Sequence, residues 1–462
     1  MSIFNSDFEL GDITSILKDV NTRVHFIGIL GAGMYPLARL LRARGYFVSG
    51  SDDKAKCEYY KDDYGIAIGR PRDSIECDIA IYSLAIDESN TEIRHLRALG
   101  IPLVSRAQLL GAVMSAFKTR ISVSGSHGKS TTTAAIDHIL CASDTQHTTV
   151  SGAALSCSES LFDGGGEIFV AEACEYKDSF LRLCPSHQII TSVELDHTDY
   201  FSGPDMLKES FIKSVSDVDV ALINVDDQGA REIYTALRSS GGQRRIYTYG
   251  KSDAADYRFY PVGHCGEITH FSVVSRERTF SLRTDLMGEF NLYNLTAATA
   301  MADIIGIDQG QIEEAVATFH AIDRRLTLLS SVDGTKIYYD YAHHPTEIGA
   351  TIFALKERYG TVTVIFRPHT YSRTKSLWND FIAEFSKAEF TIVLDIYPAR
   401  EEYIDGVDAE KLASEIPGGI YTAECDAARI ALSHHTGAVV LMGAGDVESI
   451  KQELIELGKN TG

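Results

Sequence analysis

Short apolar runs alternate with amphipathic segments over about the first hundred residues of the chain. The run RVHFIGIL (23–30) ends in a glycine-rich turn, and GMYPLARLLRARG (33–45) then places apolar residues at helical spacing. The runs YFVSGSD (46–52) and CDIAIYSLAI (77–86) have the composition of further buried strands. Because strands alternate with helices in this way, the sequence predicts a Rossmann-like α/β domain over residues 1–107.

The same alternation continues in a second block, which we place at residues 108–322. Between residues 257 and 284, apolar and polar positions alternate one by one, as in ITHFSVVS (268–275), which is typical of antiparallel strands with one solvated face. We therefore expect a central α/β domain with a mixed sheet. Its other apolar runs are EIFVAEACE (167–175), HQIITSVELDH (187–197) and VDVALINVDD (218–227).

A third α/β block, residues 323–462, begins at the junction HAIDRRL (320–326). Ligands of parallel α/β sheets bind beyond the carboxyl ends of the strands. We therefore expect the polar clusters after its four apolar runs to converge in one crevice, as part of a second Rossmann-like domain. The runs and their clusters are TKIYYD–YAHHPTE (335–347), TVTVIF–RPHTYSRT (361–374), FTIVLDI–YPARE (390–401) and AVVLMG–AGD (438–446).

Composition narrows the class of protein. The chain has 462 residues, of which 44% are hydrophobic and 23% charged, as in an ordinary soluble protein of about three domains. Its net charge of -21 argues against nucleic acid or an anionic membrane as a general partner. No apolar run reaches the roughly 18 to 20 residues of a membrane-spanning helix, and the acidic start has no signal-peptide pattern. Eight scattered cysteines without a C-x-x-C pair favour a cytoplasmic protein with reduced thiols over a disulfide framework or a zinc site.

The first of two glycine-rich loops, GILGAGM (28–34), lies between a predicted strand and a predicted helix. A helix N-terminus of this kind favours a phosphate or pyrophosphate group, and Asp52 at the end of the next strand could hold a ribose hydroxyl. Taken alone, these features suggest a nicotinamide-dependent oxidoreductase. The glycine spacing is, however, G-x-x-G-x-G and not G-x-G-x-x-G, and a tight turn without a ligand is a second interpretation.

The second loop, SGSHGKSTTT (124–133), is a variant of the phosphate-binding pattern G-x-x-x-x-G-K-[ST], with Val123 at the position of the first glycine. Lys129 supplies a positive charge for the outer phosphates, and Ser130 supplies a hydroxyl for magnesium. The two glycines of the loop let its backbone approach the phosphates closely, and the following helix adds the positive end of its dipole. A solvent loop that merely contains G-K-S is the less favoured alternative.

Acidic side chains close two of the central apolar runs. Glu172 and Glu175 end one run, and Glu194, Asp196 and His197 end another. In parallel strands beside a phosphate-binding loop, such side chains reach the phosphate-bound metal. Magnesium prefers oxygen ligands, so residue chemistry alone favours Glu172 over His197. A surface or capping role for His197 is equally compatible with its residue type.

Taken together, these motifs resemble the Mur ligase family over nearly the whole chain. SGSHGKSTTT is similar to the family's ATP loop, G-T-H-G-K-T-[ST], which also lacks the first glycine. HFIGILGAGM…VSGSD, YSLAI and IPLVSRAQLL resemble the UDP-sugar domain of the alanine-adding branch of the family, and DYAHHPTEI, RPHTYSRT, DIYPAREE and MGAGD resemble its C-terminal domain. The resemblance implies three domains that bind the UDP-sugar, ATP and the incoming amino acid, in that order.

The resemblance also implies roles for individual residues. The implied ATP-binding residues are Gly125, Ser126, His127, Gly128, Lys129, Ser130, Thr131, Asn291, Asn294, Arg325 and Asp340. The implied UDP-sugar-binding residues are Gly28, Gly31, Gly33, Met34, Asp52 and Ser83. The implied magnesium ligands are Ser130, Glu172 and His197, and the implied catalytic residues are Lys129, His343, His369 and Arg373.

The reaction implied by the resemblance is ATP-dependent ligation of L-alanine to the lactyl carboxylate of UDP-N-acetylmuramate, in peptidoglycan precursor synthesis. ATP would phosphorylate the carboxylate to an acyl phosphate, which the neutral amine of L-alanine would attack. Cations would stabilise the converging negative charges, and His343 or His369 would accept the amine proton. We expect Mg²⁺ as cofactor, a monomer or weak dimer, and movement of the C-terminal domain about residues 320–326.

Three positions depart from the family pattern: Cys174 replaces an acidic residue, Phe290 a histidine and Thr370 an arginine. The nearest alternative function is a recycling ligase that adds a preformed tripeptide to the same UDP-sugar. The run SFLRLCP (179–185), which follows the acidic cluster at once, favours the alanine-adding reaction. Alternatives from other classes are the nicotinamide-dependent oxidoreductase and a nucleotide-binding regulator without turnover.

Overall fold

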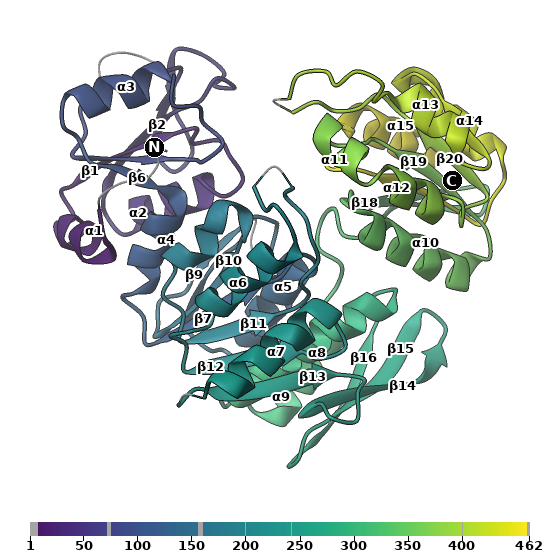
Figure 1. The fold of residues 1–462 in the computed structure, drawn as a ribbon, viewed down its shortest axis with the longest axis horizontal. Helices are drawn as coiled ribbons and strands as arrows, with labels where there is room; N and C mark the ends of the chain where they lie inside the picture. Colours follow the sequence, from purple (N-terminus) through teal and green to yellow (C-terminus); the bar gives the residue numbers. More distant parts are fainter. Residues whose placement is uncertain are drawn as a thin grey trace.

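The computed structural model describes residues 8–71, 75–155, 160–198, 200–241, 243–399 and 401–459. Within them the chain forms three β-sheets, each built from a successive part of the sequence and accompanied by helices (Figure 1). The three-part α/β architecture expected from the apolar runs is confirmed. In the view of Figure 1, the middle part lies below and between the other two.

The N-terminal part contains a six-stranded sheet in the order β3-β4-β2-β1-β5-β6, parallel except for the edge strand β3. Its central strands are buried on both faces, as expected of a parallel sheet between helices. The elements are α1 (Leu10–Ile16), β1 (Arg23–Ile27), α2 (Tyr35–Ala43), β2 (Phe47–Ser51), β3 (Tyr59–Lys61), β4 (Ala67–Gly69), β5 (Ile79–Tyr82), α3 (Thr91–Ala98), β6 (Leu103–Ser105) and α4 (Arg106–Met114).

Helix α4 joins the N-terminal part to the middle part. Ser105 caps the helix, since its hydroxyl accepts the backbone N–H of Gln108 at 3.3 Å while Gln108 reaches back to the Ser105 N–H at 2.9 Å. The buried residues of α4 share one core cluster with the first sheet and with Phe169 of the middle sheet. The boundary after residue 107 thus falls inside a connecting helix, and the domain limits at residues 107 and 322 remain predictions.

The middle part contains a ten-stranded sheet in the order β16-β15-β14-β13-β12-β11-β7-β10-β8-β9. The strands from β14 to β8 are parallel to their neighbours, whereas β9, β15 and β16 pair antiparallel. The first half runs through β7 (Thr119–Ser124), α5 (Lys129–Ala142), β8 (His147–Val150), β9 (Leu161–Asp163), β10 (Ile168–Ala173), η1 (Tyr176–Arg182), β11 (His187–Ile190) and α6 (Pro204–Ser214).

The second half of the middle part carries the antiparallel edge predicted from one-by-one alternation. Strand β15 alternates buried and accessible residues along its length, so one face packs on the core and the other meets solvent. The expected mixed sheet is confirmed. The elements are β12 (Val220–Asn224), α7 (Gln228–Ser240), β13 (Arg245–Gly250), β14 (Tyr257–Cys265), β15 (Ile268–Val274), β16 (Thr279–Thr284), α8 (Glu289–Ile304) and α9 (Gln309–Thr318).

The C-terminal part contains a six-stranded sheet in the order β17-β18-β22-β19-β20-β21, in which only β17 pairs antiparallel. Its elements are β17 (Thr327–Val332), β18 (Thr335–Asp340), α10 (Pro345–Tyr359), β19 (Val362–Phe366), α11 (Tyr371–Ser376), α12 (Trp378–Phe385), β20 (Phe390–Val393), α13 (Ala409–Glu415), β21 (Gly419–Tyr421), α14 (Glu424–Ser433), β22 (Ala438–Met442) and α15 (Glu448–Lys459).

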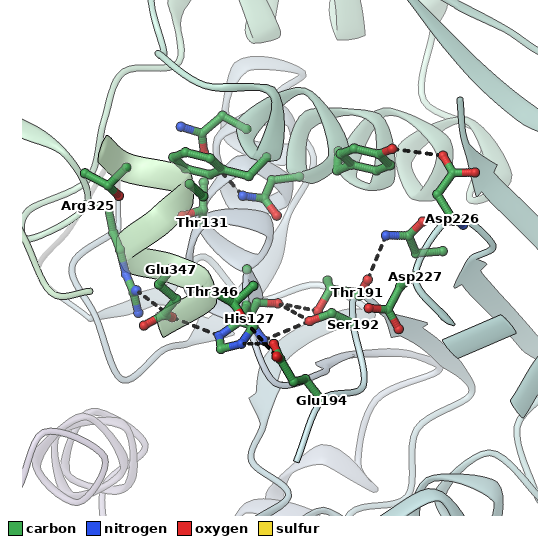
Figure 2. Close-up of a pocket in the computed structure, with 18 of the residues that line it drawn as sticks. His127, Thr131, Thr191, Ser192, Glu194, Asp226, Asp227, Arg325, Thr346 and Glu347 are labelled. Atoms are coloured by element: carbon green, nitrogen blue, oxygen red, sulfur yellow. Dashed lines mark hydrogen bonds and ion pairs between the residues drawn. The ribbon is translucent and has the colours of Figure 1, made fainter. Parts of the chain in front are cut away.

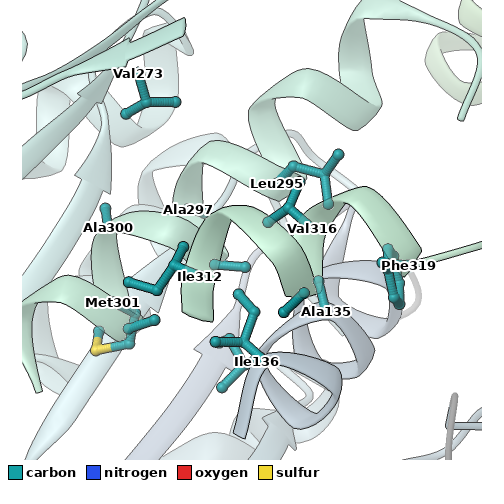
Figure 3. Close-up of a cluster of buried hydrophobic side chains, with 14 of the residues drawn as sticks. Ala135, Ile136, Val273, Leu295, Ala297, Ala300, Met301, Ile312, Val316 and Phe319 are labelled. Atoms are coloured by element: carbon teal, nitrogen blue, oxygen red, sulfur yellow. The ribbon is translucent and has the colours of Figure 1, made fainter. Parts of the chain in front are cut away.

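The core that positions the second glycine-rich loop lies between α5, α8 and α9 (Figure 3). Ile136 of α5, Leu295 and Met301 of α8 and Ile312 of α9 are all buried there. Because close-packed side chains fix the distance between helices, this cluster holds the start of α5 against the start of α8. The second glycine-rich loop, which precedes α5, and the asparagines of α8 are thus positioned by one packed core.

No helix within the described residues is both long enough and apolar enough to cross a membrane.

Candidate active site

The second glycine-rich loop turns from β7 into α5 and needs glycine at two positions. Gly125 (φ 137°) and Gly128 (φ 84°) have left-handed backbone that side chains disfavour. A Cβ at Gly125 would overlap the Thr191 hydroxyl, and a Cβ at Gly128 would overlap the Asn294 amide oxygen. Val123, at the place of the missing first glycine, is a buried strand residue. The loop therefore keeps glycine where its own backbone requires it.

Lys129 contacts several acceptors within this loop. Its Nζ donates to the carbonyl oxygens of Gly125 and Ser126 and lies 3.1 Å from Glu175 Oε2. Burial alone would lower the pKa of Lys129, but the charge and hydrogen bond of Glu175, together with the other anionic groups nearby, outweigh burial and the pKa is raised. Lys129 is therefore a permanent cation at neutral pH, held at the N-terminus of α5.

Oxygen donors suited to a divalent cation lie beside the loop. Glu172 accepts hydrogen bonds from the hydroxyls of Ser130, at 3.2 Å, and of Ser151. His197 Nε2 lies 3.8 Å from Glu175 Oε1, at the edge of this group. Hydroxyl and carboxylate oxygens are the ligands that magnesium prefers. The donor set therefore fits Mg²⁺, with Ser130 and Glu172 as its best-suited members.

His127 connects the loop to two glutamates (Figure 2). Its Nε2 lies 3.1 Å from Glu194 of the middle part, and its Nδ1 lies 3.0 Å from Glu347 in the first turn of α10. Burial alone would lower the pKa of His127, but Glu347 and Glu194 together raise it to about 10. Thr346 also donates to Glu194, at 2.7 Å. A charged imidazole thus ties the ATP loop to the C-terminal part.

A cavity of about 350 Å³ lies where the loop, α8 and the C-terminal part meet (Figure 2). The predicted ATP-binding residues among its lining are His127, Gly128, Thr131, Asn291, Asn294, Arg325 and Asp340. Others that line it are Thr191, Glu194, Asn224, Asp226, Tyr249, Phe290, Tyr293, Thr346 and Glu347.

Asp340 and Arg325 bring the C-terminal part to the cavity. Asp340 is buried at the end of β18, where Thr351 donates to it at 2.6 Å. Burial raises the pKa of Asp340 to about 6, although the hydrogen bond from Thr351 opposes this shift. The guanidinium of Arg325 lies 5.5 Å from the centre of the Tyr341 ring and reaches Ser130 Oγ at 3.5 Å.

The polar clusters after the C-terminal strands converge, as predicted. The ring centres of His343 and His369 lie 6.2 Å apart, and His369 stacks on Tyr397 with a centre distance of 5.7 Å. Arg373 Nη1 lies 3.1 Å from His369 Nδ1. Arg373 also binds Asp196 of the middle part, with Nη2 3.1 Å from Oδ1 and Nε 3.3 Å from Oδ1.

Burial and the contacts with Arg373 determine which side chains of this crevice are charged. Burial lowers the pKa of His343 to about 4, and burial together with Arg373 lowers the pKa of His369 to about 4. Both imidazoles are therefore neutral at pH 7. Burial alone would raise the pKa of Asp196, but Arg373 and His197 hold it well below the usual range. Arg373 and Asp196 therefore form a charged pair between the middle and C-terminal parts.

A continuous series of charged and imidazole groups connects the ATP loop with this crevice. Lys129 pairs with Glu175 at 3.1 Å, and Glu175 lies 3.8 Å from His197. His197 lies 3.9 Å from Asp196 Oδ2, and Asp196 pairs with Arg373. The predicted ATP-binding, metal-binding and catalytic residues are thus brought to one surface between the middle and C-terminal parts.

The predicted UDP-sugar residues gather at the first glycine-rich loop. The N–H of Leu30 donates to Asp52 Oδ2 at 3.0 Å, so Asp52 closes the loop from the end of β2. The turn that contains Ser83 abuts the loop, because Ile86 lies 3.1 Å from where a Cβ of Gly28 would be. Met34 is a buried core residue, and the glycines form the turn itself. The sugar-binding roles of Gly28, Gly31, Gly33, Met34, Asp52 and Ser83 remain predictions.

The sequence did not single out three residues that the structure places at these sites. Arg106 lies over the first loop, with Cδ 3.2 Å from where a Cβ of Gly33 would be. Glu347 and Thr346 connect α10 to the ATP loop. A capping-box pattern starting at His344 marks Glu347 as a helix-start residue, but not as the partner of a histidine 220 positions away.

Comparison with known proteins matches this arrangement to one family. Residues 23–118 match the model described as "Mur ligase family, catalytic domain", residues 123–302 match "Mur ligase middle domain", and residues 324–445 match "Mur ligase, glutamate ligase domain". The chain is also 32% identical over 451 residues to UDP-N-acetylmuramate–L-alanine ligase of Clostridium perfringens, covering 94% of this chain and 98% of that one. The chain belongs to the Mur ligase family.

Further similarities of this Mur ligase agree with that placement. It is 35% identical over 453 residues to UDP-N-acetylmuramate–L-alanine ligase of Alkaliphilus metalliredigens, covering 94% and 96% of the two chains. Its fold is similar to the structure of UDP-N-acetylmuramate–alanine ligase from Thermotoga maritima, with a TM-score of 0.77, 21% identity and coverage of 96% and 100%. A murein peptide ligase from Psychrobacter arcticus shares the fold with a TM-score of 0.68, 20% identity and coverage of 95% and 99%.

The three positions at which this Mur ligase departs from the motifs lie at the site. Phe290 lines the cavity and also packs against the C-terminal core. Thr370 (φ 67°) caps α11, with its hydroxyl accepting the Arg373 N–H at 3.4 Å. Burial raises the pKa of the Cys174 thiol, so Cys174 stays neutral and is no substitute for an acidic ligand.

Proposed function

We propose that this chain ligates L-alanine to the lactyl carboxylate of UDP-N-acetylmuramate with hydrolysis of ATP, in the synthesis of peptidoglycan precursors. Relatives 32 to 35% identical over at least 94% of the chain carry the name of that ligase. The observation that carries the proposal is the series from Lys129 through Glu175, His197 and Asp196 to Arg373. It connects a triphosphate-binding loop to a crevice with cations and neutral imidazoles, as an acyl-phosphate ligase requires.

Two cations face the two negatively charged reactants. Lys129 at the N-terminus of α5 stabilises the charge that develops on the γ-phosphate. Arg373 presents a fork of N–H donors, which suits the carboxylate that receives the phosphate. Both cations are paired with carboxylates in this structure, Glu175 and Asp196. Substrate oxygens would compete with these carboxylates for the same N–H donors.

Magnesium belongs to this proposal as a cofactor held by Ser130, Glu172 and His197. When bound, it would neutralise charge on the outer phosphates. The fit rests on the hydroxyl of Ser130 and the carboxylate of Glu172, which already meet at 3.2 Å.

His343 is the better candidate to accept the proton of the attacking amine. Its Nδ1 lies 2.9 Å from the Tyr341 carbonyl oxygen, so Nδ1 carries the proton and Nε2 has a free lone pair. In His369, by contrast, Nδ1 faces a donor of Arg373, which places the proton on Nε2. The amine becomes more acidic once it is bonded to the acyl carbon, and the neutral imidazole of His343 presents the lone pair that can accept its proton. We therefore assign the proton acceptor to His343 and the positioning of Arg373 to His369.

The comparisons favour this reaction over the alternatives. Eight curated relatives share the name of the alanine ligase, whereas similarity to murein peptide ligase shows the fold alone. The nicotinamide-dependent oxidoreductase rested on the first glycine-rich loop alone, and that loop lies within residues 23–118, which match a model of the Mur ligase family. Action in the cytoplasm as a monomer or weak dimer is part of the proposal, as expected from the reduced cysteines and from the family.

Phosphate release tests the proposal directly. The full chain is supplied with ATP, magnesium and UDP-N-acetylmuramate, and then with L-alanine, glycine, L-serine or the cell-wall tripeptide, one at a time. We expect release that needs both the UDP-sugar and L-alanine. Release with the tripeptide alone would assign the chain to recycling, and no release with any acceptor would contradict ligation.

A further inference from the structure

A second group of metal-type ligands lies at the far end of α5. Asp137 and Cys141 are one helical turn apart on this helix, and His147 begins β8. His147 Nε2 lies 3.0 Å from Asp137 Oδ1 and 4.0 Å from Cys141 Sγ. One ligand atom of each residue lies within 4.8 Å of the other two. At 1.5 Å rise per residue, Asp137 is about 12 Å along the helix from Lys129, so this group is separate from the ATP loop.

The hydrogen bonds of His147 leave its second nitrogen facing an acceptor. Nδ1 lies 2.7 Å from the Thr145 carbonyl oxygen, which can only accept, so Nδ1 carries a proton. In a neutral imidazole Nε2 is then an acceptor, yet it faces the carboxylate of Asp137, which is also an acceptor. Asp137 and His147 are both 0% exposed. Asp137 Oδ2 has no hydrogen-bond partner among the residues that the structure describes, an arrangement that buried polar groups seldom show.

We propose that Asp137, Cys141 and His147 bind a zinc ion. A cation between the three groups gives Nε2 of His147 and one oxygen of the Asp137 carboxylate a partner. Imidazole, thiolate and carboxylate are all established zinc ligands, and a histidine ligand characteristically donates its other N–H to a carbonyl, as His147 does to Thr145. One thiolate and one carboxylate also balance the two positive charges of the ion.

The distances require little rearrangement. With bonds of about 2.3 Å to sulfur and about 2.1 Å to nitrogen and oxygen, tetrahedral geometry separates sulfur from nitrogen by about 3.6 Å and nitrogen from oxygen by about 3.4 Å. The observed separations are 4.0 Å and 3.0 Å. These two separations are therefore within about half an ångström of the tetrahedral values, and all three ligand atoms lie within 4.8 Å of one another. The His147 ring is already fixed, since it stacks on Phe162 with a centre distance of 4.6 Å.

The site would act on stability and not on ligation. It joins the last turns of α5 to β8, the strand beside β10, which carries Glu172. The mixed pattern D-x₃-C-x₅-H explains why a search for paired cysteines predicted no zinc site. Three protein ligands leave a fourth position, which water can occupy, because Cys141 is only partly buried.

The test uses the full chain, freed of metal with a chelator, kept in excess magnesium and titrated with zinc or cobalt. We expect about one zinc ion per chain to survive dialysis, and cobalt to produce the absorption of a thiolate–metal bond. In Cys141→Ser, zinc affinity should fall more than about tenfold and the thiolate absorption should disappear. Zinc should raise the melting temperature of the wild type but not of this variant.

Cys174→Ser is the matched control, because Cys174 is the thiol beside the proposed magnesium ligands and should not affect zinc binding. A wild type without bound zinc, or zinc binding that survives Cys141→Ser, would overturn the proposal. In that case His147 and Asp137 form a buried hydrogen-bonded pair without a metal, and Asp137→Asn lowers the melting temperature equally with and without zinc. The same measurement therefore decides between the two interpretations of the group.

Discussion

At the scale of single residues, Lys129 shows how the site is prepared for charge. Glu175, only 2% exposed at its side chain, holds the ammonium group in place before any phosphate arrives. A buried cation with a fixed partner needs little reorganisation when a phosphate replaces that partner. The same logic applies to Arg373, which Asp196 holds beside His369. Prepositioned charges of this kind are expected in an enzyme that must activate a carboxylate.

Lys129→Ala should therefore lower the rate of phosphate release by at least about a hundredfold, since charge stabilisation of the γ-phosphate is lost. The measurement is phosphate release with saturating UDP-N-acetylmuramate and L-alanine, together with circular dichroism to verify folding. Lys118→Ala is the control, because Lys118 is 78% exposed at its side chain and pairs only with exposed Glu167. Full ligation by the Lys129 variant would refute the assignment of the ATP loop.

The two histidines of the crevice should respond differently to substitution. His343→Gln should reduce kcat by about a hundredfold or more, as expected on loss of a general base. His369→Gln should mainly raise KM, because it disturbs the position of Arg373 and leaves the proton acceptor in place. Since the pKa of His343 is about 4, protonation of this base should lower wild-type kcat only as the pH approaches 4, whereas a change near pH 6 is expected from Asp340. An equal loss of kcat in both variants would contradict the assignment.

At the scale of elements, most strands could be predicted because they are buried on both faces and appear as continuous apolar runs, such as 220–224 and 438–442. The phosphate-binding loop could be predicted because its residues are contiguous in the sequence. The role of Glu347 could not, since this residue acts by contacting His127, which is 220 residues away. Zinc-type ligands of mixed residue type were missed for a related reason: their pattern has no recurring spacing. Strands, helices and contiguous motifs can therefore be predicted from the sequence, whereas contacts between residues of different parts depend on the assembled fold.

Helix α4 gives a test of how elements pack across parts. A Cβ on Gly111 would overlap the carbonyl oxygen of Arg182 and lie 3.2 Å from its carbon. Gly111→Ala should therefore destabilise the chain by about 1–3 kcal/mol, as overpacking does. Gly11→Ala is the matched control in α1, where nothing lies within 4 Å of the new Cβ and the better helix former should stabilise by about 0.5–1 kcal/mol. Denaturant unfolding should show midpoint shifts of opposite sign; shifts of the same sign would show that the α4 contact is loose.

At the scale of the whole molecule, polar side chains join the C-terminal part to the middle part. His127 and Glu347 form one charged contact and Arg373 and Asp196 another, and the hydroxyl of Thr346 donates to the carboxylate of Glu194. Arg325 also reaches Ser130, and Phe290 packs against the C-terminal core. The connection between the two parts runs through residues 319–326, where Arg324 (φ 65°) and Leu326 (φ 49°) have left-handed backbone. Strained backbone at such a junction is suited to a hinge. We therefore expect the C-terminal part to move as a unit, held closed by these contacts.

The pH dependence of closure follows from His127. Its pKa is raised from 6.5 to about 10, so its contribution to stability is complete below pH 6.5 and is lost as the pH rises through about 10. The pKa of Glu347 is lowered, so its contribution is present at neutral pH and is lost only in acid. The attraction between the two parts should therefore be strongest below pH 6.5, still partly present at pH 8 and lost as the pH passes about 10.

Small-angle scattering can measure this closure. In Glu347→Gln at pH 8, loss of the charged contact should raise the radius of gyration by roughly 1 Å, against about 23 Å for a compact chain of this length. The wild type should show the same increase only near pH 10, and ATP with UDP-N-acetylmuramate should reverse it in both proteins. Glu357→Gln is the control, because Glu357 is on the same helix and outside the cavity lining. Superimposable profiles for the wild type at pH 8, the wild type near pH 10 and Glu347→Gln at pH 8 would mean that His127 and Glu347 do not control the position of the C-terminal part.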